Sequence, residues 1–552
     1  MCERQSQVTV LARLFFIGAC LIAACGGQAP TPAPSAAPPE PSIAAPTVAA
    51  EAEPVTLTVT RAGTFSISPV NVSSDEAVQH VLPLYESLVL LGTDGSIVPA
   101  LAESWETDDY QTWTFHLRKG VVFHDGTPFN AEAVKYNFNR QFRVPAQSGG
   151  SYALYADENS AEVVDDYTIV FHLTLPFFNF LPDMGYYNRY AIASPTYLQA
   201  NSSTSDADAT EFMNTHECGT GPFKLVEFVP DQRIVYEEFP QYWGGVPGGK
   251  SPAHVDRLIF QVIKDPDTAR VELEAGRVDI WDGPPPAHLE GLRQTPGVEV
   301  ISFPDLRIAY LTMDVSKPPF DDVSVRRAIA YAINYEELRA AGELGTAFPQ
   351  CGMIPDGVTD YLAGDPSLCM YPYDPVKARE SLAQSAYPDG FTTDLIYTPL
   401  RNAGFDLEAL LLQSYLAEIG ITVNIQSMDP VTTQIARMAE GSYGLSLMSW
   451  SGPPNPDDFV GWYYDFGRLP PNDSWVGSFW LDEQVMSDMR AARDAVDPQQ
   501  KKALYEGANR RAMEEAIYIP LFQGSHNVAI RDNVEGLLFK YGDLHISYVE
   551  KE

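Results

Sequence analysis

Apolar and polar side chains alternate along many short segments in the first half of the chain. An apolar residue at every second position is the period of a strand with one buried face. In TWTFHL, for example, Trp113, Phe115 and Leu117 share one face, whereas His116 points to the other. We therefore predict strands at 55–60, 113–117, 167–176, 219–228, 232–239, 254–263 and 278–281.

In the second half, apolar residues recur every three or four positions, which predicts amphipathic helices. The segments 323–341 and 405–420 show this pattern, and the second runs directly into the strand pattern of 421–428. A late helix at 497–516 is followed by a strand at 517–524. These units are typical of an α/β domain, and the last strand predicts that the chain crosses back into its first part.

The stretch 113–138 holds two histidines, an aspartate, a lysine and an arginine, so it invites a catalytic interpretation. Asp125 and Gly126 form a strong turn signal, however, and Asn130 is a natural N-cap for a helix at 131–142. Just before this stretch, 86–92 is predicted to end a helix. Each polar residue of 113–138 thus has a structural role, and we predict that the stretch is scaffold.

The N-terminus predicts a lipoprotein signal peptide at 1–24. The 11 apolar residues of 14–24 have the length of a signal-peptide core and are too short to span a bilayer. Small residues precede Cys25, which resembles the cysteine that bacteria modify with lipid. Cys20 is a competing cleavage site with a shorter apolar run. A buried apolar helix is the structural alternative.

Residues 25–54 follow as a spacer rich in proline and alanine. With almost no large apolar side chains, this segment cannot bury enough surface to fold. We therefore expect a lipid anchor, a tether and then a globular body on the outer face of the cytoplasmic membrane.

Length and charge limit the choice of function. A chain of 552 residues is too long for one core and predicts two to four structural units. With 73 acidic and 36 basic residues, the formal net charge is −37. Such a surface repels phosphate backbones and anionic lipid headgroups, which argues against nucleic acid as a partner.

Motifs for catalysis, metals and cofactors are missing from the sequence. There is no nucleophile elbow, no HExxH, no phosphate-binding loop and no EF-hand loop, and the nine histidines are scattered. We therefore expect no enzyme activity, no metal and no cofactor. Cys351 and Cys369 can form a disulfide across a short loop or stay reduced, and Cys218 is then the unpaired, buried thiol.

Trp450 is the aromatic residue that we single out as a candidate for ligand binding. It ends the predicted strand 444–450 and leads into SGPPNPDDF, a loop whose prolines exclude a helix or a central strand. The carboxyl end of a strand is where α/β domains place ligands.

Many segments, in order, resemble the extracytoplasmic solute-binding proteins of ABC importers, family 5, which include oligopeptide-, dipeptide- and nickel-binding proteins. The resemblance runs from about 56 to the C-terminus. The segments that carry it are YESLV, PALAESWE, TWTFHLRKGVVFHDGTPFNAEAVKYNFNR, GTGPFKL, YWGG, DPDTARVELEAGRVDI, PPFDDVSVRRAIAYAINYEEL, YDPVKARESL and LAEIGITVNIQ.

The resemblance implies an α/β fold with two lobes, the Venus-flytrap fold of periplasmic binding proteins (class II, cluster C). The first lobe would comprise 55–309, with an extra subdomain at about 80–200. The second lobe would comprise 310–517, and 518–552 would return into the first. Ligand would be enclosed between the lobes by a hinge motion.

The resemblance also implies candidate ligand residues. Peptide-binding relatives carry an aspartate shortly after the tryptophan of the Trp450 loop, but Pro453 stands there in this chain, and Asp457 comes later. Arg401 matches an arginine that holds a ligand carboxylate in dipeptide-binding relatives. Further candidates to line the cleft are Ser451, Gly452, Phe65, Trp281 and Tyr310.

The expected function is thus a substrate-binding lipoprotein, a monomer that delivers peptides or a related small solute to a membrane permease. A non-peptide solute, such as a metal chelate, an oligosaccharide or an opine-like molecule, is the alternative within the same fold. A secreted hydrolase and a sensory lipoprotein are the alternatives from other classes.

Overall fold

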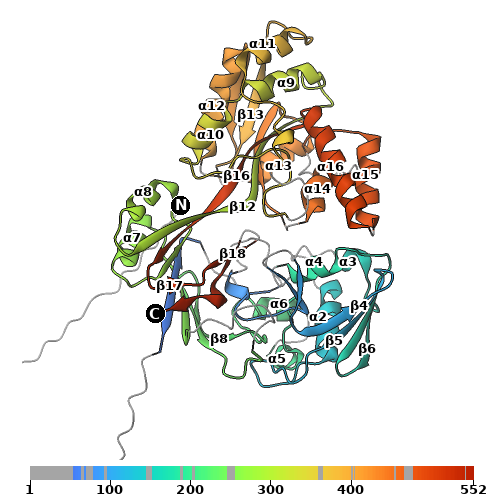
Figure 1. Cartoon of the computed structure of the whole chain (residues 1–552), viewed down its shortest axis with the longest axis vertical. Coiled ribbons are helices and arrows are strands. Elements are labelled where there is room, and N and C mark those ends of the chain that lie inside the picture. The colour runs from blue at the N-terminus through green and yellow to red at the C-terminus, as the bar shows by residue number, and fades with distance from the viewer. Residues whose placement is uncertain are drawn as a thin grey trace, which may run out of the picture. The chain divides into compact units, whose positions relative to one another are not determined.

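The first strand of the globular part, β1 (Thr56–Arg61), lies inside a ten-stranded sheet in the computed structural model of the chain (Figure 1). The structure describes residues 54–552 except 64–66, 70–78, 93–95, 144–151, 187–189, 202–205, 245–254, 359–364, 400–401, 403, 430, 453–454, 465–476, 496 and 541–542. The predicted signal peptide, Cys25 and the spacer up to Glu53 lie outside the described residues.

The ten strands follow the order β14-β13-β15-β12-β16-β11-β1-β10-β9-β8. β1 pairs in parallel with β10 and β11, and β13 pairs in parallel with β14 and β15, so each end of the sheet contains parallel strands. The other bounds are β8 Phe223–Val229, β9 Arg233–Glu238, β10 Arg257–Val262, β11 Ile280–Asp282, β12 Val298–Met313, β13 Phe391–Tyr397, β14 Ile421–Ser427, β15 Leu445–Trp450 and β16 Tyr518–Arg531.

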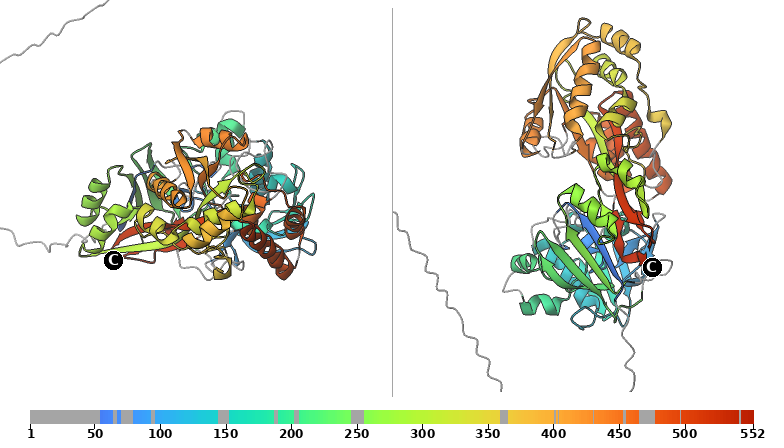
Figure 2. Two further views of the ribbon diagram at one scale, coloured as in Figure 1. Left: turned by 90° about the horizontal axis from the view of Figure 1, so that it is seen from above. Right: turned by 90° about the vertical axis from the view of Figure 1, so that its left-hand side faces the viewer.

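Two long antiparallel strands, β12 and β16, join the two ends of this sheet. Their register runs from Val298 opposite Arg531 to Thr312 opposite Tyr518, with irregularities after Pro304 and Ala309. They stay side by side in both views of Figure 2. β16 also pairs with β11, so the end of the chain returns to the strands of its beginning. The residue boundaries that we expect for the two lobes remain predictions.

A second sheet, of four antiparallel strands in the order β4-β5-β7-β6, packs with α2 around an aromatic core. The predicted N-cap is confirmed, because Asn130 Oδ1 accepts a hydrogen bond from Ala133 N at 3.0 Å. Val134 and Phe138 of α2 are buried, as their spacing predicted. The bounds are β4 Ala102–Glu106, β5 Thr112–Leu117, β6 Ala161–Asp165, β7 Thr168–His172 and α2 Ala131–Arg143.

Short elements complete this part of the chain. The prediction that 86–92 ends a helix is wrong, since Val89–Leu91 is a strand, β2, that pairs with β3 (Ile97–Pro99). Val89 is buried there in one cluster with Leu101 and Met184, a non-local environment that local sequence does not reveal. The short helices are α3 Tyr152–Tyr155, α4 Phe180–Gly185, α5 Pro195–Asn201 and α6 Asp206–Phe212.

Helices cover both ends of the ten-stranded sheet. The single helix predicted at 323–341 is two helices, because the chain is extended at Ile333 and Asn334 caps the second one. The bounds are α7 Pro266–Glu274, α8 Pro286–Arg293, α9 Val323–Ala332, α10 Tyr335–Gly342, α11 Pro375–Ala383, α12 Phe405–Glu418, α13 Val431–Ala439, α14 Val460–Tyr464, α15 Glu483–Asp494 and α16 Pro498–Glu514. The remaining elements are η1 Pro366–Leu368, η2 Pro456–Asp458, η4 Ile546–Tyr548, β17 Val534–Glu535, β18 Leu538–Lys540, β19 Asp543–His545 and β20 Glu550–Lys551.

The stretch 113–138 serves the fold, as predicted. Asp125 accepts hydrogen bonds from Thr127 and Ser194, which closes its turn. His124 is buried, with Nδ1 2.7 Å from Glu217 Oε2 and Nε2 3.0 Å from the carbonyl oxygen of Gly221. Both neighbours are acceptors, so the ring donates from both nitrogens. Burial opposes the charge of the ring, but Glu217 outweighs it and raises the pKa of His124.

Candidate functional site

Trp450 ends β15, and its indole closes the loop that follows. Its Nε1 donates a hydrogen bond to the backbone oxygen of Asp458 at 3.0 Å, and the ring is half-buried against the core below. A Cβ on Gly452 would lie 3.2 Å from that nitrogen, so a larger residue there would press on the ring. Ser451, between the two, is half-buried. The predicted loop is therefore folded back onto its own tryptophan.

Asp457 belongs to the framework of this loop. Its carboxylate lies 2.8 Å from Nε of Arg493 on α15, and the hydroxyl of Tyr505 on α16 donates to it at 3.2 Å. We predicted Asp457 as a ligand residue. The structure instead gives it two internal partners that hold η2 against α15 and α16, which leaves little of its charge for a ligand amino group.

The loop also meets the segment around α4, which comes from the part of the chain with the four-stranded sheet. The hydroxyl of Tyr186 donates to the carbonyl oxygen of Gly452 at 3.4 Å. Asn179 Nδ2 donates to Asn455 Oδ1 at 3.3 Å. The candidate loop thus faces residues that are more than 250 positions away in the sequence.

Two other predicted ligand residues lie in hydrophobic cores instead. Trp281 on β11 is 2% exposed and packs with residues of α7 and α8. Tyr310 on β12 is also 2% exposed and meets Tyr518 edge to face at 5.7 Å. Both rings are therefore buried in this structure, and their predicted contact with a ligand stays a prediction. Phe65, Arg401 and Pro453 lie outside the described residues.

A charged cluster at the carboxyl ends of β1 and β11 is a feature that the sequence interpretation missed. Asp282 accepts a hydrogen bond from Gln79 at 2.9 Å, lies 3.5 Å from Arg61 and is 2.5 Å from Nε2 of His526. Burial alone would raise the pKa of Asp282, but His526 and then Arg61 lower it below its usual range. The same pairing raises the pKa of His526 in spite of burial.

The signal for this cluster was only partly present in the sequence. Arg61 and Asp282 each directly follow a predicted strand, and the carboxyl ends of neighbouring parallel strands meet at one edge. His526 comes 244 residues after Asp282, so its place depends on the pairing of β16 with β11.

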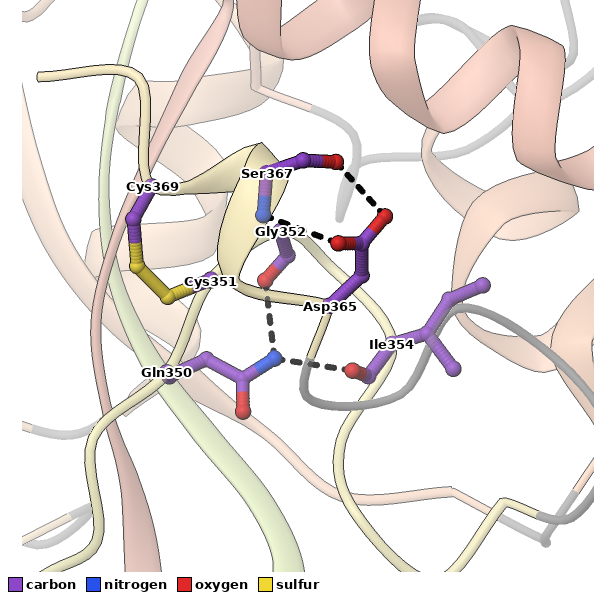
Figure 3. The surroundings of a disulfide bond; sticks show 7 residues. All are labelled: Gln350, Cys351, Gly352, Ile354, Asp365, Ser367 and Cys369. Carbon is purple, nitrogen blue, oxygen red and sulfur yellow. Dashed lines mark hydrogen bonds between the residues drawn. A yellow bond between two sulfur atoms is a disulfide. The ribbon is translucent and has the colours of Figure 1, made fainter.

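The cysteines of the second half form a disulfide, Cys351–Cys369, which closes a loop packed beside α16 (Figure 3). Gln350 Nε2 donates to the carbonyl oxygens of Gly352 and Ile354, at 2.9 and 2.8 Å. Asn509 of α16 accepts from Met353 N at 3.2 Å. Cys218 is a free, buried thiol whose pKa burial raises.

Within the described residues, no group of three or more histidine, cysteine or acidic side chains could hold a metal ion. In the same residues, no helix is long and apolar enough to cross a membrane.

Comparison with known proteins gives one consistent result. A sequence model of the bacterial extracellular solute-binding proteins, family 5 Middle, matches residues 96–468. The dipeptide-binding protein of Escherichia coli K12 is 29% identical over 478 residues, which cover 82% of this chain and 86% of that protein. Heme-binding protein A of Haemophilus influenzae is 34% identical over 389 residues, with 66% and 68% covered.

A solved structure extends the likeness to the fold. The periplasmic binding protein DppA of Helicobacter pylori, in complex with the peptide STSA, matches with a TM-score of 0.71 and 27% identity. The match covers 90% of this chain and 98% of that chain. The expected two-lobed α/β fold of periplasmic binding proteins is thereby confirmed.

Proposed function

Because the chain belongs to family 5 of the bacterial extracellular solute-binding proteins, we propose that it captures peptides or a related small solute for an ABC importer. The relatives that match it are binding proteins by name, and one is bound to a tetrapeptide. The observation that carries the proposal is the loop after β15. Trp450 and Asp457 each tie this loop down by a hydrogen bond, and it faces Tyr186 and Asn179 from the opposite part of the fold.

We propose that no acidic side chain at the start of this loop binds the amino group of the ligand. Pro453 replaces the aspartate that the resemblance leads one to expect, and Asp457 is engaged by Arg493 and Tyr505. A peptide with a blocked N-terminus should therefore bind about as well as a free one. Arg401 remains our candidate for a ligand carboxylate, and the face of Trp450 for its apolar part.

A non-peptide solute is the second candidate, and the same observation favours it. With Pro453 in the place of the expected aspartate and Asp457 engaged by Arg493, these two positions do not require an amine in the ligand. A relative that matches two thirds of the chain is named for heme. Metal chelates, oligosaccharides and opine-like molecules remain in this class.

Thermal shift on the folded body, from about Glu53 onward, tests the peptide proposal. One pooled peptide library is offered in two versions, free and N-acetylated, with heme as a third arm. A ligand at about 100 times its Kd stabilises the folded state by roughly 2.7 kcal/mol, which is a clear shift in melting temperature. Equal stabilisation by both peptide versions is the expected result.

Other results change the proposal in defined ways. Stabilisation by free peptides alone would mean that another acidic residue binds the amino group of the ligand. It would refute the proposal that binding is indifferent to this group because Pro453 replaces the aspartate. Stabilisation by heme alone, or by neither peptide version, would remove peptides as the ligand class.

Anchoring is the remaining part of the proposal. Cys25 would carry lipid on the outer face of the cytoplasmic membrane, and 25–54 would tether a monomeric receptor near its permease. In cells, Cys25→Ala should move the protein from the membrane fraction to the soluble fraction, and Cys20→Ala should not. If Cys20→Ala releases it instead, the cleavage site is assigned wrongly.

A further inference from the structure

Asn179 starts α4 but does not cap it. Asparagine is a preferred N-cap because its side chain can accept a hydrogen bond from the first turn, and this side chain makes no such bond. It points to the other part of the fold instead. Nδ2 donates to Asn455 Oδ1 at 3.3 Å, and Oδ1 accepts from Nζ of Lys501 at 2.9 Å.

Lys501, which donates the hydrogen bond to Asn179, is a buried cation. It lies in the first turn of α16 and is 1% exposed, a rare state for a lysine. Its ammonium group also lies 4.5 Å from the centre of the Phe178 ring, the residue before Asn179. A carbonyl oxygen and an aromatic face thus replace part of the water around this charge.

The contact leads directly into the candidate ligand loop. Asn455 Oδ1, which receives Asn179, also accepts a hydrogen bond from Asp457 N at 3.1 Å. Tyr186, at the other end of α4, donates to Gly452 in the same loop. Both ends of α4 therefore touch the segment that follows β15.

We propose that Lys501, Asn179 and Phe178 form a latch that holds α4 against the loop after β15 and so sets how often the binding protein closes. This inference rests on the proposed function, because closure matters only in a receptor that encloses a ligand. Lys501 acts through Asn179 and Asn455. It is a positioning residue and does not need to contact the ligand.

The latch should shift the equilibrium between open and closed forms by a measurable factor. Lys501→Met keeps the length of the side chain but removes its charge and its donors. Loss of a desolvated cation–π contact and of one charged hydrogen bond should favour the open form about tenfold, which corresponds to roughly 1.4 kcal/mol.

The chain offers a matched control on the same helix. Lys502 has a 45% exposed side chain and pairs with Glu506 on α16 at 3.3 Å. Lys502→Met removes the same charge from the next residue of the helix. Lys501→Arg keeps a cation near Phe178, so it should shift the equilibrium towards the open form less than Lys501→Met does.

The test uses the whole folded body without ligand, so its outcome does not depend on which solute is bound. Small-angle X-ray scattering should give a larger radius of gyration for Lys501→Met and for Asn179→Ala, and hydrogen exchange should become faster at 178–186. Lys502→Met should match the parent protein in both measurements. If Lys501→Met does not fold, Asn179→Ala carries the test.

Unchanged scattering and exchange in both variants would overturn the latch. An equal change in Lys502→Met would also overturn it, because the effect would then come from charge loss on α16. A lower melting temperature with an unchanged radius would mean a purely structural role. If no ligand raises the melting temperature in the thermal-shift test, the proposed function is refuted. The scattering and exchange measurements can still be interpreted, because they are made without ligand.

Discussion

One N–H of Arg493 is shared between both carboxylate oxygens of Asp457, with Nε 2.8 Å from Oδ1 and 3.0 Å from Oδ2. This pair fixes η2, the short helix at the end of the candidate ligand loop, to α15. An aspartate that sequence alone offers as a ligand residue is thus also a structural partner within the loop.

We expect Arg493→Met to destabilise the protein. The variant leaves a partly buried carboxylate with one partner fewer, so the free energy of unfolding should fall by about 1–2 kcal/mol. Urea denaturation measures the change. Arg490→Met, on the exposed face of the same helix, is the control and should have little effect.

Asp457→Asn separates the structural role from a ligand role. It should cost stability in the same way and should weaken free and N-acetylated peptides alike. Selective loss of free peptides with unchanged stability would mean that Asp457 reads the amino group.

His80 should make the protein less stable in acid. Burial, and then the charge of Arg61, lower the pKa of His80 to about 3, although Asp282 acts in the opposite direction. An unfolded histidine has a pKa of about 6.5, so only the unfolded state takes up this proton between those values. The contribution to stability is fully present above pH 6.5 and is lost as the pH falls toward 3.

Comparison of the parent with His80→Gln isolates this effect. The difference in unfolding free energy should change by about 1.4 kcal/mol per pH unit between pH 6 and 4. His116→Gln, on the exposed face of β5, should run parallel to the parent. A parallel course for His80→Gln would show that the ring is charged in the folded state.

Glu408 should act in the opposite direction, at higher pH. This carboxyl group on α12 is 0% exposed and lies where Gly342 and Gly404 leave room for it. Burial, together with the neighbouring charge of Glu343, raises the pKa of Glu408 to about 8, and Arg307 offsets part of this. The protonated form is favoured by folding, so its contribution is present below about pH 4.5 and is lost as the pH rises through 8.

Glu408→Gln should therefore become more stable than the parent as the pH rises. The gain should be about 1.4 kcal/mol per pH unit between pH 5 and 8. Glu418→Gln, exposed at the end of the same helix, should show no such trend. An equal trend in both variants would mean that general surface charge, and not the buried site, is responsible.

The disulfide should stabilise the loop between Cys351 and Cys369, which lie 18 residues apart. Closing a loop of this length in the unfolded chain corresponds to about 3 kcal/mol of stability. The double variant Cys351→Ser, Cys369→Ser should lose about this much, and the parent should match it under reducing conditions. Free thiols in unreduced tryptic peptides of the parent would contradict the bond.

Local signals in the sequence predicted local structure well. The alternation around Trp113 and the N-cap at Asn130 depend on neighbouring residues alone, and both predictions are confirmed. The break inside 323–341 was missed because Asn334 occurs within a helical pattern and acts as a cap only when the chain is extended before it.

The candidate site was harder to predict because it depends on contacts between distant segments. Trp281 and Tyr310 have the side chains of a ligand-binding cleft. Trp281 instead packs against α7 and α8, the helices on either side of it in the sequence, and Tyr310 packs against Tyr518 of the distant strand β16. The role of Asp457 depends in the same way on Arg493, and that of Asn179 on Lys501. The family resemblance pointed to this loop as a ligand site, which stays a prediction, and the structure shows which of its residues the protein itself holds.

The place of β16 in the sheet has a consequence for biosynthesis. This strand is drawn from the last 35 residues of the chain, yet it lies between β12 and β11, in the interior of the ten-stranded sheet. Until it has been translated, β11 and β12 have no strand between them, and the two ends of the sheet are joined only through the chain. A ribosome-bound chain therefore cannot complete its ten-stranded sheet before this strand has been synthesised.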